Sequence, residues 1–76
     1  MAKLPRNMSG RDVVKHLEKI GYAVDHQRGS HIILKHAERP LPRLSVPDHK
    51  NVRVGLLRKI IRDAGLSPEE FVKLIG

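Results

Sequence analysis

A tight turn at Arg28-Gly29-Ser30-His31 constrains the fold of this chain most, because it predicts a β-hairpin. A Gly-Ser pair between two strands suits a type II′ turn, whose first loop residue needs a positive φ that glycine adopts at little cost. Such a turn sets the register of the strands and places Arg28 opposite His31 on one face of the sheet. We therefore predict strands over residues 22–28 and 31–36.

The alternation of apolar residues leaves open which face of this hairpin is buried. One face of a regular hairpin would carry four side chains: Val24, His31, Ile33 and Lys35. The other face would carry Ile32 and Leu34. If helices cover the second face, His31 points to solvent, whereas it lies at the edge of the core if they cover the first. A β-bulge would reconcile the two patterns.

Three helices are predicted around the strands. Ser9 suits an N-cap with an acid three residues later, and the apolar residues that follow at helical spacing predict a helix over 10–20, ended by Gly21. A second helix is predicted from about Val54 to Gly65, again from apolar spacing. A short third helix starts at Ser67-Pro68, an N-cap followed by proline at the first helical position. The apolar face of the first helix consists of Val13, Val14, Leu17 and Ile20, and that of the second consists of Leu57, Ile60, Ile61 and Ala64.

The remaining segments are predicted as one short strand, loops and a tail. A third strand over 43–46 is stopped by Pro47, and prolines at 40 and 42 make residues 37–42 a loop. Residues 1–8 show no periodicity and are expected to form a loose N-terminal tail. His16, His49 and Lys50 are expected at the surface.

These elements predict a single α+β domain over residues 1–76. The order is α-β-β-β-α with a short C-terminal helix, and the small sheet needs two helices on one of its faces. Double-stranded-RNA-binding domains use this arrangement.

The composition excludes several kinds of protein. A chain of 76 residues has no room for a second domain or a large pocket, and without cysteine it has neither disulfides nor thiolate metal sites. No apolar run reaches the ~18 residues of a membrane-spanning helix, and the N-terminus lacks the apolar stretch of a signal peptide. We expect a soluble, cytoplasmic protein with no membrane partner. His26, His31 and His36 are five apart, which alternates their faces on strands and argues against a shared zinc ion.

The net charge of +7 is concentrated in the middle of the chain. The basic residues of this region are Arg28, Lys35, Arg39, Arg43, Lys50, Arg53, Arg58, Lys59 and Arg62, against the acidic Glu38 and Asp48. Because this excess surrounds the glycine turn, it indicates a polyanion as partner, and nucleic acid before an anionic membrane.

The turn itself is the candidate site. Histidine has the unperturbed pKa that best suits proton transfer near neutral pH, and arginine keeps its charge and binds phosphate. The sequence therefore indicates His31 and Arg28 as the functional pair.

Together these motifs resemble the HicA-type toxins of prokaryotic toxin–antitoxin pairs, which are small mRNA-cleaving enzymes with a double-stranded-RNA-binding-like fold. The resemblance runs from Ser9 to Phe71. Its marks are Gly21-Tyr22, the turn at 28–31, Lys35-His36, Val46-Pro47-Asp48-His49 and the stretch from Leu57 to Leu66. The chain departs from the family in its proline-containing loop over 37–42 and in Val54-Gly55-Leu56, where a Pro-Gly-Thr helix start is common.

The resemblance implies an mRNA endoribonuclease whose catalytic residue is His31 and whose partner is a HicB-like antitoxin. RNA cleavage without a metal or other cofactor uses the 2′-hydroxyl as nucleophile, so the protein must move protons and stabilise charge on phosphate. Arg28 and Lys35 are the first candidates to bind phosphate, with Lys50 and Arg53 more distant. His36 and His49 are candidates for a second proton-transfer group.

Two alternatives belong to other functional classes. A non-catalytic RNA-binding module of the same fold would share the basic face but would not depend on His31. An adaptor for an acidic protein would bind RNA weakly and lose it at physiological salt. The scarcity of aromatic residues argues against recognition of single strands by base stacking.

Overall fold

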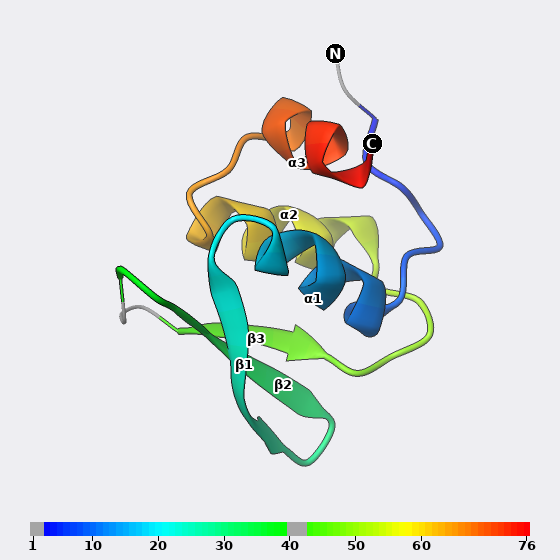
Figure 1. Ribbon diagram of the computed structural model, residues 1–76. Coiled ribbons are helices and arrows are strands. Elements are labelled where there is room, and N and C mark those ends of the chain that lie inside the picture. The colour runs from blue at the N-terminus through cyan, green and yellow to red at the C-terminus, as the bar shows by residue number, and fades with distance from the viewer. Residues whose placement is uncertain (1–2, 40–42) are drawn as a thin grey trace.

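The computed structural model describes residues 3–39 and 43–76. Its elements are α1 (Gly10–Glu18), β1 (Tyr22–Arg28), β2 (His31–His36), β3 (Leu44–Pro47), α2 (Val54–Asp63) and α3 (Pro68–Ile75). Helices α1 and α2 lie on one side of the antiparallel sheet, and α3 lies on the far side of these helices from the sheet (Figure 1). The predicted α+β class and the double-stranded-RNA-binding-like arrangement are confirmed.

The hairpin forms as the turn predicts. Gly29 has a φ of 60°, and Arg28 pairs directly with His31 across the two strands. The sheet order is β1-β2-β3, which leaves β3 at an edge. The third strand was predicted over 43–46 but spans Leu44–Pro47, because proline is tolerated at the end of an edge strand, where Pro47 pairs with His31. Residues 40–42 of the predicted loop, with both prolines, lie outside the described residues.

A β-bulge decides which face of the hairpin is buried. The register shifts between Val24, which pairs with Leu34, and His26, which pairs with Ile33. Asp25 is the extra residue of β1. The bulge therefore allows Ile32 and Leu34 to face the helices, while His31 is exposed on the opposite, open face of the sheet.

The core lies between the sheet and the helices. Its fully buried side chains are Phe71, Leu17, Leu34, Leu57, Ile61, Val13, Val46 and Val52. Of the residues predicted at helical spacing, all join the core except Ile20, which packs against its edge. Helix α1 ends at Glu18, two residues before the predicted end, and the chain turns through Gly21 at a φ of 102°.

The N-terminal segment is not the loose tail that the sequence predicts. Leu4 and Met8 are buried in the core cluster, and the backbone N–H of Val52 donates to the carbonyl of Met8 at 2.8 Å. Burial of two large apolar side chains holds residues 3–8 against the domain. Met1 and Ala2 lie outside the described residues.

His36 is not a surface residue, which corrects its assignment as a candidate proton-transfer group. Its Nδ1 accepts from the backbone N–H groups of Glu38 (3.1 Å) and Arg39 (3.3 Å). Its Nε2 therefore carries the hydrogen and donates to the carbonyl of Ile20 at 2.8 Å. The ring is 8% exposed and stacks edge-on against Tyr22, so its role is to join the end of β2 to the turn after α1.

Helices α1 and α3 begin directly after the N-cap residues that the sequence predicts. Ser9 accepts from the backbone N–H of Asp12, and Ser67 forms a complete capping box with Glu70 after which Pro68 opens α3. Helix α2 begins at Val54 as predicted, although Arg53 makes no side-chain cap.

Candidate functional site

His31 opens β2 on the open face of the sheet. It lies between Arg28 of β1 and Pro47 of β3, its two cross-strand partners. Directly paired residues of an antiparallel sheet have Cβ atoms about 5 Å apart, so Arg28 and His31 can contact the same ligand. The predicted pair is thus brought together by the register of the hairpin.

Ser45 of β3 orients the His31 ring. Its Oγ lies 3.3 Å from His31 Nδ1. When Nδ1 carries the hydrogen and donates it to Ser45, Nε2 keeps a free lone pair and faces away from this contact. Sequence analysis did not identify Ser45, although the alternation of its strand places it on the open face with His31.

Asp48 ties the tip of the hairpin to the rest of the domain. Its backbone N–H donates to the carbonyl of Ser30 at 2.7 Å, and its carboxylate accepts from Gln27 at 3.4 Å. The same carboxylate forms an ion pair with Arg11 of α1 at 3.1 Å. These contacts link α1, β1 and the segment after β3, and they hold the turn that precedes His31.

Asp48→Asn is expected to destabilise the protein at neutral pH and to make little difference at low pH. The hydrogen bond from Arg11 lowers the pKa of Asp48 below its ordinary 3.8. A lowered folded-state pKa stabilises the protein above pH 3.8, and this stabilisation is lost as the pH falls through the folded-state value. Urea denaturation of both proteins between pH 3 and pH 7 measures the difference, which should also shrink in high salt. A difference independent of pH would contradict this account.

The other predicted phosphate-binding residues lie further from His31. Lys35 is on the same strand and face but four residues along, which corresponds to about 13 Å. Lys50 and Arg53 are exposed in the connection from β3 to α2. Of the four predicted residues, Arg28 alone pairs directly with His31.

His26 lies on the open face with His31, two residues before Arg28 in β1. It pairs with Ile33, two residues beyond His31, so it is a diagonal neighbour of His31 at about 7–8 Å between Cα atoms. Its Nδ1 lies 2.8 Å from the Asp25 carboxylate, a hydrogen bond that lowers the pKa of Asp25. The odd spacing of His26 and His31 placed them on opposite faces in the sequence analysis, but that count treats the two as if they lay on one strand. Across the two-residue turn, the regular pairing of Arg28 with His31 puts His26 and His31 on the same face.

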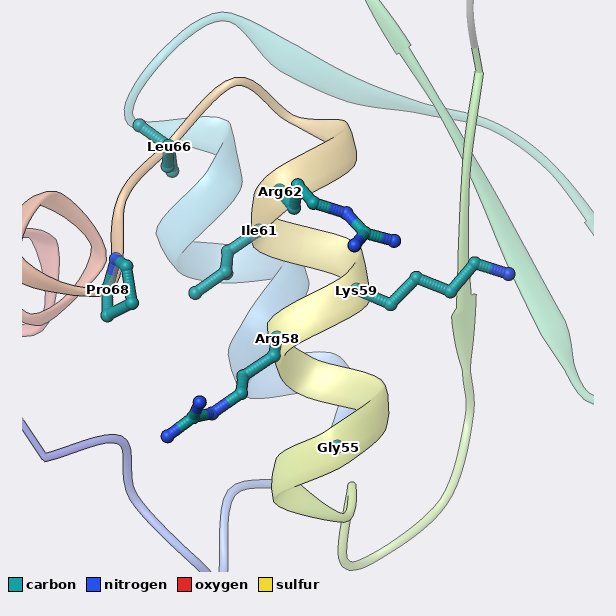
Figure 2. Close-up of a pocket in the computed structure, with 7 residues that line it drawn as sticks. All are labelled: Gly55, Arg58, Lys59, Ile61, Arg62, Leu66 and Pro68. Carbon is teal, nitrogen blue, oxygen red and sulfur yellow. The ribbon is translucent and has the colours of Figure 1, made fainter.

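A cleft extends from His31 along the edge of the sheet, between β3 and α2. Its volume is about 380 Å³. The residues that give it its chemical character are His31, Arg43, Ser45, Leu56, Lys59 and Asp63. Figure 2 shows the Lys59 side chain reaching from α2 toward β3. We call this hollow the β3–α2 cleft.

Helix α2 carries further positive charge around a second hollow, which Arg58 and Arg62 line with Leu66 and Pro68. In Figure 2 the Arg58 side chain points away from β3, whereas the Arg62 guanidinium lies on the same side of α2 as Lys59. Both arginines are exposed, as the sequence predicts for the polar side of this helix. The basic surface therefore extends from the open face around the edge of the sheet.

The described segments contain neither a metal-binding cluster nor a membrane-spanning helix. Within residues 3–39 and 43–76, no group of three or more His, Cys, Asp or Glu side chains could hold a metal ion. Nor does any helix in these segments have the length and apolar character needed to cross a membrane.

A comparison with known protein families agrees with the family that the sequence motifs resemble. The sequence model of the family described as "HicA toxin of bacterial toxin-antitoxin" matches residues 10–66, which include all three strands and the helices α1 and α2. No curated protein matches the chain. Because the family match covers most of the chain, including the turn with His31, this protein belongs to the HicA toxin family of bacterial toxin–antitoxin systems.

Proposed function

We propose that this toxin is a metal-independent endoribonuclease that cleaves mRNA with His31 as its catalytic histidine. The observation that carries the proposal is the setting of His31, which is exposed on the open face, held by Ser45 through Nδ1 and paired with Arg28. His31 supplies a base, Arg28 a cation and Ser45 a hydroxyl that orients the base. Cleavage at a phosphate uses a base and a cation in this way.

In the proposed reaction, His31 Nε2 removes the proton of the 2′-hydroxyl, whose oxygen attacks the adjacent phosphorus. The bond from phosphorus to the 5′-oxygen breaks, and that oxygen takes a proton from His26. The products are a 2′,3′-cyclic phosphate and a 5′-hydroxyl. Arg28 stabilises the charge that develops on the phosphate oxygens, and Lys35, Lys50 and Arg53 bind the RNA backbone further from the cut.

His26 replaces His36 and His49 as the proposed proton donor. His36 is buried and uses both ring nitrogens in the fold. His26 is exposed, and its contact with the Asp25 carboxylate uses Nδ1, which leaves Nε2 free to face substrate.

A HicB-like antitoxin is the proposed protein partner. Membership in a toxin–antitoxin family implies a partner of this kind. We place the activity in the cytoplasm, where mRNA is found.

The experiment that tests this function is incubation of the purified protein with a long single-stranded RNA in EDTA. Cleavage with 2′,3′-cyclic phosphate ends is expected, and added HicB-like antitoxin should suppress it. Binding of RNA without cleavage would overturn the enzymatic proposal and favour a non-catalytic RNA-binding module.

His26→Ala is expected to lower the cleavage rate by about a hundredfold, at the low end of what a general acid contributes, because water can protonate the leaving oxygen. Since the acid must be protonated, the variant should also lose the decline in rate at high pH. Single-turnover rates across a pH series measure both effects. His49→Ala tests whether His49 is the proton donor instead. A larger loss of cleavage rate in His49→Ala than in His26→Ala would reject His26 as the donor.

A further inference from the structure

The β3–α2 cleft has two chemically different ends. Strand β3 and helix α2 run in opposite directions along it (Figures 1 and 2). His31 and Leu56 therefore lie near the end where β3 finishes, and Arg43 and Asp63 lie near the other. Asp63 lies seven positions after Leu56 along the helix, which corresponds to about 10 Å. This length matches a nucleotide that continues from a phosphate held at His31, rather than the phosphate alone.

The inner surface of the cleft suits a base better than a phosphate. Leu56 is 40% exposed here, and Ile60 lies one turn further along the same side of α2. Leu56 offers an apolar surface to the flat face of a base, and Ile60, which is 3% exposed, lies beneath this surface in the core. The Asp63 carboxylate repels a phosphate, while Arg43 and Lys59 can contact the backbone. Among the described residues, Asp63 forms no ion pair that would neutralise it.

We propose that this cleft binds the base of the nucleotide adjoining the cleaved phosphate, and that Asp63 selects guanine; the proposal rests on the ribonuclease function above. A carboxylate only accepts hydrogen bonds, so it favours a base edge with two neighbouring N–H donors. Guanine presents such a pair, N1–H and the N2 amino group, on the edge that is free in single-stranded RNA. Asp63 is then a specificity residue beside the catalytic histidine.

The first test compares cleavage of matched oligonucleotides that differ only in the base beside the cut. The native protein should cut the guanine substrate faster than the adenine substrate. In Asp63→Ala, this ratio should fall by about five- to a hundredfold, which is the discrimination expected of a good bidentate contact. Glu18→Ala is the matched control, because it removes the same charge from an exposed position on α1 and should keep the native ratio. An unchanged ratio in Asp63→Ala would overturn the proposal.

A binding measurement separates this proposal from the proposed function. The His31→Ala protein is titrated with short single-stranded RNAs that contain guanine or adenine, and the methyl resonances of Leu56 and Ile60 are followed by NMR. The guanine RNA should cause larger shifts and bind more tightly than the adenine RNA, and this preference should be lost in the His31→Ala/Asp63→Ala double variant. That result supports guanine binding in the cleft even if the native protein proves not to cleave RNA. No shift at these methyl groups would overturn the cleft assignment even if cleavage by the native protein is established.

Discussion

His31→Ala is expected to lower the rate of RNA cleavage by about 10²–10⁴-fold without changing the fold or the affinity for RNA. Proton transfer by a positioned side chain contributes a factor of this size. The histidine is exposed, and its one side-chain hydrogen bond among the described residues is the contact with Ser45. Its removal therefore leaves the core intact, and Arg28 and the other cations still bind the RNA backbone.

The measurement is a single-turnover cleavage rate in EDTA, with circular dichroism and RNA binding followed on the same preparations. His31→Gln is the matched variant, since the amide keeps a hydrogen-bonding group near Ser45 but cannot exchange a proton at neutral pH. Both variants should be equally inactive. Native-like cleavage by either one would assign catalysis to another group, and loss of RNA binding together with cleavage would make His31 a binding residue.

The parts of the fold that follow from local chemistry were predictable. The turn at Gly29, the capping box at Ser67 and the apolar spacing in α2 each depend on residues within one or two turns of each other. The bulge at Asp25 depends on pairing with β2 and on burial of Ile32 and Leu34, so the sequence admitted it only as one alternative. Likewise, the burial of Leu4 and His36 depends on contacts with segments distant in the chain.

The residues of the candidate site also differ in whether local sequence or tertiary structure decides their position. Arg28 and His31 flank a turn of two residues, so their proximity is a local property of the hairpin. Ser45 reaches His31 only through the pairing of β3 with β2, and Asp63 reaches the same cleft only through packing of α2 beside β3. His26 lies two residues before Arg28, so the register of the hairpin alone puts it on the His31 face, and the sequence analysis missed it by counting the odd spacing along one strand. Ser45 and Asp63 were missed because tertiary structure decides their position.

Gly10→Ala is expected to destabilise the protein by about 3 kcal/mol, near the upper end of the usual range for overpacking. A Cβ at Gly10 would overlap the carbonyl oxygen of Pro47 and lie 2.9 Å from its carbonyl carbon. Both are backbone atoms, so no side-chain rotation relieves the contact. Helix α1 would have to move away from β3 and weaken the hydrogen bond from Gly10 N–H to the carbonyl of His49. Because a domain of this size is stable by roughly 4–11 kcal/mol, the loss is a large share of the total.

Gly55→Ala is the matched control, because it makes the same chemical change in the first turn of α2, where an added Cβ meets no atom within 4 Å. Alanine has the higher helix propensity, so this variant should be more stable than the native protein by up to about 1 kcal/mol. Urea denaturation followed by circular dichroism compares the three proteins. Changes of opposite sign would show that the close approach of α1 to Pro47, the cross-strand partner of His31, requires glycine. A Gly10→Ala protein within about 1 kcal/mol of the native one would mean that α1 can shift off β3 at little cost.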